Sequence, residues 1–312
     1  MFWQPVDRLL GGVQAVYVSV DGVYNKVNLN TLYLPDEGRY LLEKYFVKYL
    51  TNTRDLLEEA AVASLGGNPG VLCLGDPAYE SNPPAVNPAA EAVALQRTSL
   101  YAGPITPLPG TRQEVVFIDS LMRAHGWQSQ LYTGAEASEE VLQKEDLPAV
   151  LHLATHGFFL ADIPTRKLAD MAGQNQLSAN PLFRSGLLFA GAATPAADMA
   201  KDGVLTAYEA MNLYLDNTGL VVLSACETAL GNIRNGEGVY GLQRALLVAG
   251  AGQLIMSLWK VDDLATMELM RLFYTGLASG QSVEKALRSA QLAMLQKNMK
   301  PYYWGAFILI GK

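Results

Sequence analysis

The stretch LVVLSAC, residues 220–226, decides the fold prediction. Its first four residues are apolar without alternation, which is typical of a strand buried on both faces in the middle of a parallel sheet. A second stretch, AVLHLATHG (149–157), has the same character and also ends in a reactive side chain. Such strand-like runs alternate with helical periodicity along the chain. We therefore predict an α/β fold, with a mainly parallel sheet flanked by helices on both faces.

Breakers and periodicity divide the chain into two regions. GGNPG (66–70) separates a predicted amino-terminal subdomain, residues 1–68, from a catalytic core, residues 69–312. In the first region we expect a helix over residues 40–50, where apolar side chains recur at helical spacing.

A capping box is predicted near the start of the core. Thr111 and Glu114 have the Thr-x-x-Glu spacing in which each side chain bonds the other residue's backbone amide. Apolar residues at helical spacing follow this pair, so we expect a helix that begins at Thr111.

Composition excludes several classes of protein. The net charge is −7, and the 23 Lys and Arg residues are scattered, so no cluster is available to bind the phosphates of a nucleic acid. No apolar run approaches the roughly 18 residues of a membrane span. Two cysteines cannot form a disulfide framework, and we expect a cytoplasmic protein.

The reactive side chains follow the two apolar strands. Ligands of open α/β sheets bind beyond the carboxyl ends of the strands. There His156 follows one strand and Cys226 follows the other. A thiolate nucleophile, an imidazole that moves its proton, and amide donors for the oxyanion are the requirements of a cysteine peptidase. We predict Cys226 as nucleophile, His156 as base, and the backbone amides of Gly157 and Cys226 as oxyanion donors.

The remaining cysteine and histidines have structural interpretations. Cys73 lies inside the apolar run 71–74 and is expected to be core. His152 and His156 would stand roughly 13 Å apart on one extended strand, so they cannot share a metal ion. We expect no metal and no cofactor, and we expect His152 to be a hydrogen-bonded core residue.

Five stretches, in this order and spacing, resemble the CHAT domain, a caspase-like family related to separases and often carried behind tetratricopeptide repeats. SVDGVYNKVNLNTLYL (19–34) resembles the amino-terminal part of the same domain, so the resemblance covers nearly the whole chain. The five stretches are PLPGTRQEV (107–115), LHLATHGFF (151–159), LVVLSACETALG (220–231), GEGVYGLQRALLVAGAGQLIMSLWKVDD (236–263) and PYYWGAFILIG (301–311).

This resemblance implies a caspase-type fold and a bacterial cysteine endopeptidase, with His156 and Cys226 as the catalytic dyad. It implies a protein or peptide substrate and regulation by a partner or an attached sensor region. The amino-terminal region would extend or brace the catalytic sheet. CHAT domains are usually carboxyl-terminal parts of larger proteins, so we expect tetratricopeptide repeats ahead of residue 1.

Four residues are candidates for substrate binding. Separases select basic residues with a carboxylate whose equivalent here is Met267, which does not favour basic specificity. Asp262 and Asp263 are the nearest carboxylates in sequence, although an aspartate before a helix also caps it. Glu237 has the same two interpretations.

Two alternatives to the endopeptidase stay open. One is a catalytically silent, caspase-like interaction module, which would have no unusually reactive thiol at Cys226. The other is a cysteine hydrolase of a small amide or ester, which would turn over activated esters without cutting peptides.

Overall fold

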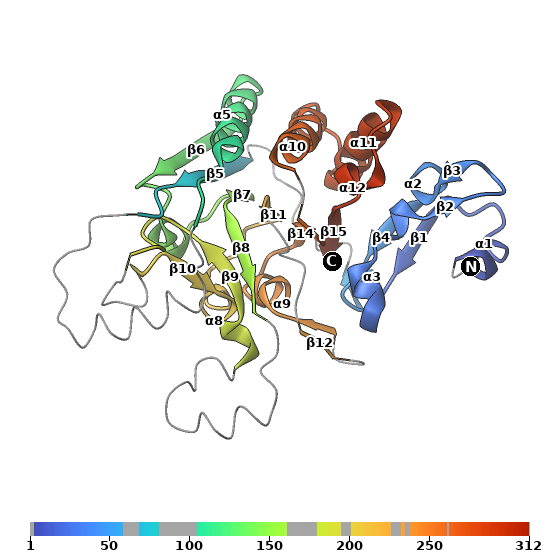
Figure 1. The fold of residues 1–312 in the computed structure, drawn as a ribbon, viewed down its shortest axis with the longest axis horizontal. Coiled ribbons are helices and arrows are strands. Elements are labelled where there is room, and N and C mark those ends of the chain that lie inside the picture. Colours follow the sequence, from blue (N-terminus) through green and yellow to red (C-terminus); the bar gives the residue numbers. More distant parts are fainter. Residues whose placement is uncertain are drawn as a thin grey trace.

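A computed structural model describes residues 3–58, 69–80, 105–160, 180–194, 201–225, 232–234, 238–260 and 262–311. Its centre is an eight-stranded sheet whose order is β1-β4-β15-β14-β11-β7-β5-β6 (Figure 1). Neighbouring strands are parallel, except that β14 and β15 are antiparallel. The predicted mainly parallel sheet is therefore confirmed. The strands are β1 (Ala15–Val18), β4 (Phe46–Tyr49), β5 (Gly70–Pro77), β6 (Gln128–Gly134), β7 (Val150–Ala154), β11 (Leu220–Leu223), β14 (Gln253–Ser257) and β15 (Phe307–Gly311).

Helices cover both faces of this sheet, as predicted. α5 (Pro109–Ala124), α10 (Asp263–Ala278) and α11 (Val283–Gln296) lie on one face, and α9 (Leu242–Val248) lies on the other (Figure 1). The shorter helices are α1 (Gln4–Asp7), α2 (Leu41–Lys44), α3 (Asp55–Glu58), α8 (Ala207–Ala210) and α12 (Pro301–Trp304). None of the helices in the described part of the chain is long and apolar enough to cross a membrane.

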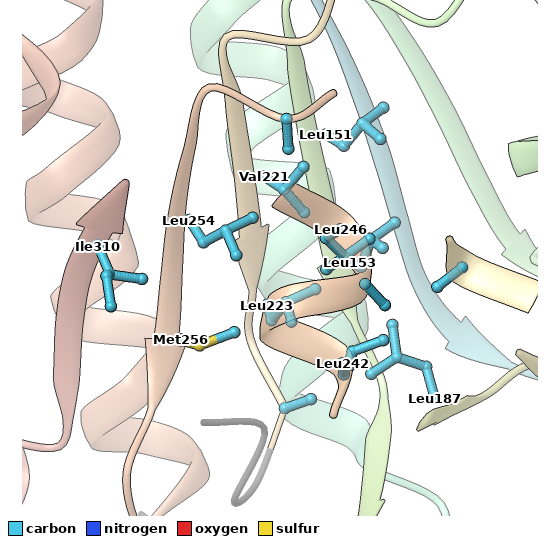
Figure 2. Packing of buried hydrophobic residues seen from close by; sticks show 14 of the residues in the cluster. Leu151, Leu153, Leu187, Val221, Leu223, Leu242, Leu246, Leu254, Met256 and Ile310 are labelled. Carbon is cyan, nitrogen blue, oxygen red and sulfur yellow. The ribbon is translucent and has the colours of Figure 1, made fainter. Parts of the chain in front are cut away.

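Two buried clusters alternate along the central strands. Leu153 and Leu223 belong to the cluster that packs on α9 (Figure 2), whereas Ala154 and Val222 belong to the cluster beneath α5 and α10. Successive side chains of a strand point to opposite faces. Both faces of β7 and β11 are thus buried, which explains why their sequences show no hydrophobic alternation.

The amino-terminal region contributes two strands to one side of this sheet. β1 pairs with β4, and β4 pairs with β15 through Tyr49 and Ile310. The predicted helix over residues 40–50 is wrong, because only α2 is helical and the next residues form β4. Pairing with β1 and β15 has overridden the local periodicity, which is ambiguous for short apolar runs. The predicted boundary at residue 68 lies outside the described residues.

The predicted capping box is also wrong. α5 begins at Pro109, and proline is favoured at the first position of a helix because its missing N–H would be unpaired there anyway. The Thr111 hydroxyl donates to the carbonyl of Leu108 at 2.6 Å and accepts from the amide of Asp76 at 3.1 Å. Glu114 is buried instead of reaching back along the helix.

Smaller sheets complete the fold. The three-stranded antiparallel sheet β10-β9-β8 stands beside the carboxyl end of β7, since β8 starts at His156. Its strands are β8 (His156–Phe159), β9 (Ser185–Leu188) and β10 (Val204–Thr206). Two-stranded pairs are formed by β2 (Tyr33–Leu34) with β3 (Arg39–Tyr40), and by β12 (Asn232–Arg234) with β13 (Gly238–Tyr240). Short 3-10 helices occupy Gly22–Lys26, Leu29–Thr31, Glu139–Gln143 and Pro181–Phe183.

Candidate active site

The two predicted dyad positions follow neighbouring strands. β7 and β11 pair in parallel, with Leu153 opposite Leu223, and the Ser224 amide donates to the Leu153 carbonyl at 2.9 Å. His156 and Cys226 each come three residues beyond that matched pair. Adjacent strands run roughly 4.8 Å apart. The sulfur of Cys226 lies outside the described residues, so its distance to His156 stays a prediction.

The ring of His156 is held by a backbone carbonyl. Its Nε2 lies 2.7 Å from the carbonyl oxygen of Thr106, in the segment that leads into α5. A carbonyl can only accept, so Nε2 carries a hydrogen and donates it. In the neutral ring, Nδ1 is then the nitrogen able to take a proton. The arrangement of an oriented imidazole with one basic nitrogen available is the one that proton transfer requires.

A network of buried hydroxyl groups lies next to this histidine. The ring of Tyr79 lies 5.5 Å from the His156 ring, centroid to centroid. The Tyr79 hydroxyl bonds the Thr155 hydroxyl at 3.0 Å, and Thr155 in turn donates to the carbonyl of Leu188. Burial raises the pKa of Tyr79, which keeps its proton available for this bond. The network ties β7, β9 and the segment after β5 together at the residue that precedes His156.

The backbone of Gly157 faces the edge of the small sheet. The Leu160 amide donates to the carbonyl of Arg184 at 2.7 Å, and hydrogen-bonded pairs alternate along an antiparallel ladder. His156 and Phe158 therefore point their amides toward β9, and Gly157 points its amide the other way. The role of the Gly157 amide as an oxyanion donor stays a prediction. The second predicted donor, the amide of Cys226, lies outside the described residues.

A small pocket opens beside the two strand ends. Its lining includes Thr155 and Ala225, which directly precede the two dyad positions, and also Ser224, Ser257 and Trp259. Glu114 of α5 and Asp263 of α10 complete its acidic side. The cavity volume is about 30 Å³, which is room for about two water molecules.

The structure separates the four predicted substrate residues. Asp263 lines the pocket. Asp262 instead accepts from the amides of Leu264 and Ala265 and so caps α10. Met267 is half-buried and is not among the residues of the described lining, and Glu237 lies outside the described residues.

A polar cluster lies behind the pocket in the core. His152 is fully buried, with Nε2 2.8 Å from Glu114 Oε1 and Nδ1 3.0 Å from the Tyr274 hydroxyl. The prediction that His152 is a hydrogen-bonded core residue is thus confirmed. Burial raises the pKa of Tyr274 well above its usual value, so this hydroxyl stays protonated and can donate. Cys73 is fully buried, as expected for a core residue.

The model of the CHAT domain matches residues 1–312. The chain belongs to the CHAT-domain family. Among known proteins, this CHAT domain is similar to tetratricopeptide repeat protein 28 of Homo sapiens, with 25% identity over 223 residues, which is 66% of the chain. The same protein of Mus musculus is 33% identical over 110 residues, or 35% of the chain. The chain spans 8% and 4% of the lengths of these two proteins.

A solved structure defines the fold class. The crystal structure of the Arg-specific cysteine proteinase gingipain R matches with a TM-score of 0.55 and 10% sequence identity. The match covers 99% of this chain and 66% of that one. The CHAT domain therefore has the predicted caspase-like fold. The expected bacterial source stays a prediction, since the two relatives named above are mammalian.

Sequence reasoning missed the groups that hold His156, one of the two predicted dyad residues. The carbonyl of Thr106 has no signature, because any residue type offers one. Tyr79 and Thr155 gave no signal beyond ordinary strand and loop composition. Glu114 did carry a signal, its spacing from Thr111, but that spacing favoured the wrong interpretation.

Proposed function

We propose that this CHAT domain is a cysteine endopeptidase in which Cys226 is the nucleophile and His156 the general base and acid. The observation that carries the proposal is the matched position of the two residues beyond neighbouring parallel strands. The Nε2–Thr106 hydrogen bond supports the proposal, because it leaves Nδ1 of His156 as the nitrogen that can take a proton.

The proposed reaction has two stages. His156 Nδ1 takes the thiol proton of Cys226, and the thiolate attacks the scissile carbonyl carbon to form a C–S bond. The Gly157 amide stabilises the oxyanion, and the Cys226 amide is the proposed second donor. The C–N bond then breaks as the imidazolium returns its proton to the leaving amine. In the second stage a water, deprotonated by His156, hydrolyses the thioester and restores the thiol.

The carbonyl of Thr106 supports this cycle electrostatically. When His156 becomes an imidazolium, the hydrogen bond from Nε2 becomes charge-assisted and therefore stronger. A nearby imidazolium also lowers the pKa of a cysteine thiol. Both effects favour the thiolate–imidazolium pair that attacks the substrate.

The substrate and the regulation of cleavage are proposed from the family of the chain. A protein or peptide is the proposed substrate. Because the curated relatives are named as tetratricopeptide repeat proteins, we propose that such repeats, carried outside these residues, bind a partner that controls cleavage. The buried free thiol Cys73 supports a reducing compartment, and we propose the cytoplasm.

Peptide-library cleavage with the purified chain tests the proposal. Cys226→Ala and His156→Ala are each expected to lower the cleavage rate by at least about 10³-fold, the scale seen when a member of a catalytic group is removed. Their circular dichroism should match that of the parent chain. Cys73→Ala and His125→Ala are matched controls outside the site and should still cleave. Wild-type cleavage by Cys226→Ala would refute the mechanism.

A further inference from the structure

We propose that the pocket beside the dyad binds the lysine side chain of the substrate residue whose carbonyl is attacked, with Glu114 and Asp263 as its specificity determinants. This inference rests on the proposed peptidase function and names the substrate class of that site. It differs from the sequence-based expectation, in which Met267 occupies the position of the specificity carboxylate.

Position identifies the pocket as part of the substrate site. Thr155 and Ala225 line it, and the residues that follow them are His156 and Cys226. A substrate carbonyl held at Cys226 would therefore carry its own side chain next to this opening. The pocket lies between the ends of β7, β11 and β14 and the first turns of α5 and α10, where substrates of open α/β sheets bind.

The charged residues of the pocket lining favour a cationic ligand. Glu114 and Asp263 are its charged residues, and no lysine, arginine or histidine is found among the described lining residues. Asp262 already caps α10, so Asp263 is not needed for that role. The described residues provide no hydrogen-bond or ion-pair partner for the side chain of Asp263, so its carboxylate is available for a ligand.

Glu114 contributes a buried negative charge. It is 3% exposed, and its Oε1 receives a hydrogen bond from His152 Nε2. The Tyr274 hydroxyl can donate to the other ring nitrogen, at 3.0 Å. These two hydrogen bonds hold the ring of His152 and the carboxyl group of Glu114 in place. A buried carboxylate gains from a cationic partner, and an ammonium group of the substrate would provide one.

A hydroxyl group also lines the same pocket. Ser224 is 5% exposed and belongs to the pocket lining, next to Ala225. A serine hydroxyl in a pocket can accept a hydrogen bond from a ligand. An ammonium offers three donors, which suits two carboxylates and one hydroxyl.

We expect a preference for lysine over arginine, because the cavity of about 30 Å³ has room for about two water molecules. A lysine ammonium is compact, whereas a guanidinium is a planar group of four heavy atoms. Trp259 forms part of the wall, and its Nε1 donates to the carbonyl of Tyr302 at 3.0 Å, which fixes the indole. An indole in this place can add a cation–π attraction.

Covalent labelling of Cys226 by peptidyl acyloxymethyl ketones tests the inference. Four ketones differ only at the residue next to the reactive group: lysine, arginine, norleucine or glutamate. The readout is the rate constant of labelling, followed by intact mass. Lysine should react at least about tenfold faster than norleucine, its neutral counterpart, since a hydrogen bond to a charged group supplies that factor. Arginine should be slower than lysine, and glutamate slowest.

Variants connect the preference to the pocket. Asp263→Asn should reduce the lysine-to-norleucine ratio by about tenfold, whereas Asp146→Asn, at an exposed aspartate elsewhere, should leave the ratio intact. Glu114→Gln should act in the same direction, with thermal melting as the check on folding. Equal labelling by lysine and norleucine, or a preference that survives both variants, would overturn the pocket assignment while leaving the peptidase proposal standing. Failure of every ketone to label Cys226 would instead refute the peptidase proposal itself.

Discussion

Replacing Thr155 with valine should destabilise the protein by about 1.5 to 4.5 kcal/mol, although the two side chains have nearly the same shape. Thr155 is fully buried directly before His156. Its hydroxyl donates to the carbonyl of Leu188 and accepts from the hydroxyl of Tyr79 at 3.0 Å. Losing the first bond costs about 0.5–1.5 kcal/mol, and leaving the buried Tyr79 hydroxyl without an acceptor costs about 1–3 kcal/mol more.

A double-mutant cycle isolates the second contribution. In a Tyr79→Phe background there is no phenol to leave unsatisfied, so Thr155→Val should then cost only about 0.5–1.5 kcal/mol. Urea unfolding followed by tryptophan fluorescence measures all four proteins. Thr275→Val is the matched control, because that threonine is exposed on α10, and its cost should stay within about 0.5 kcal/mol.

The same variant should also impair catalysis if the enzyme proposal holds. Thr155 helps to fix the backbone that presents His156, so kcat should fall while KM for a peptide changes little. Additive costs of Tyr79→Phe and Thr155→Val, within about 0.5 kcal/mol, would refute the reasoning that the two hydroxyls depend on one another.

Three further predictions concern other parts of the molecule. Burial raises the pKa of Cys73, so iodoacetamide at neutral pH should leave this thiol unmodified in the native protein and alkylate it only in denaturant. Intact mass measures the modification, and rapid alkylation of Cys73 in the native protein would contradict its burial. Asp262→Ala removes two hydrogen bonds at the start of α10 and should cost about 0.5–2 kcal/mol in urea unfolding, and a neutral result would argue against the cap. Hydrogen bonds from Arg271 and Lys297 lower the pKa of Glu268 to about 2. The contribution of the ionised Glu268 to folding stability is therefore complete above pH 4.5 and is lost as the pH falls toward 2. Glu268→Gln should therefore lower the free energy of unfolding by less than about 1 kcal/mol at pH 6 and by progressively less below pH 4. A destabilisation that grows in acid would contradict the lowered pKa of Glu268.

The central part of the fold was predictable because it follows from burial alone. β7 and β11 are buried on both faces, and their mainly apolar composition appears directly in the sequence around residues 150–154 and 220–223. Two such strands predict a parallel sheet, and they also predict the edge of that sheet at which His156 lies. The expected positions of the dyad therefore needed no information about distant contacts.

The failures occurred where distant contacts decide local structure. Residues 46–49 became a strand because β1 and β15 pair with them, and neither pairing is visible within that window. Glu114 left the expected capping box because His152, on another element, bonds it in the core. The carbonyl that orients His156 comes from Thr106, 50 residues away, and a backbone group has no residue-type signature. The candidate reactive groups thus carry a sequence signal, whereas the groups that hold His156 do not.

The position of β15 has a consequence for biosynthesis. It separates β4 from β14, so the early strands reach the sheet only through a strand translated much later, and Asn28 bonds the carbonyl of Gly305 across 277 residues. At a translation speed of about 5 to 20 residues per second, the first segment would wait on the order of 10 to 60 s for its docking surface. A nascent chain should consequently expose β1 and β4 to chaperones during this interval, and ribosomes stalled before residue 307 should carry an incomplete sheet.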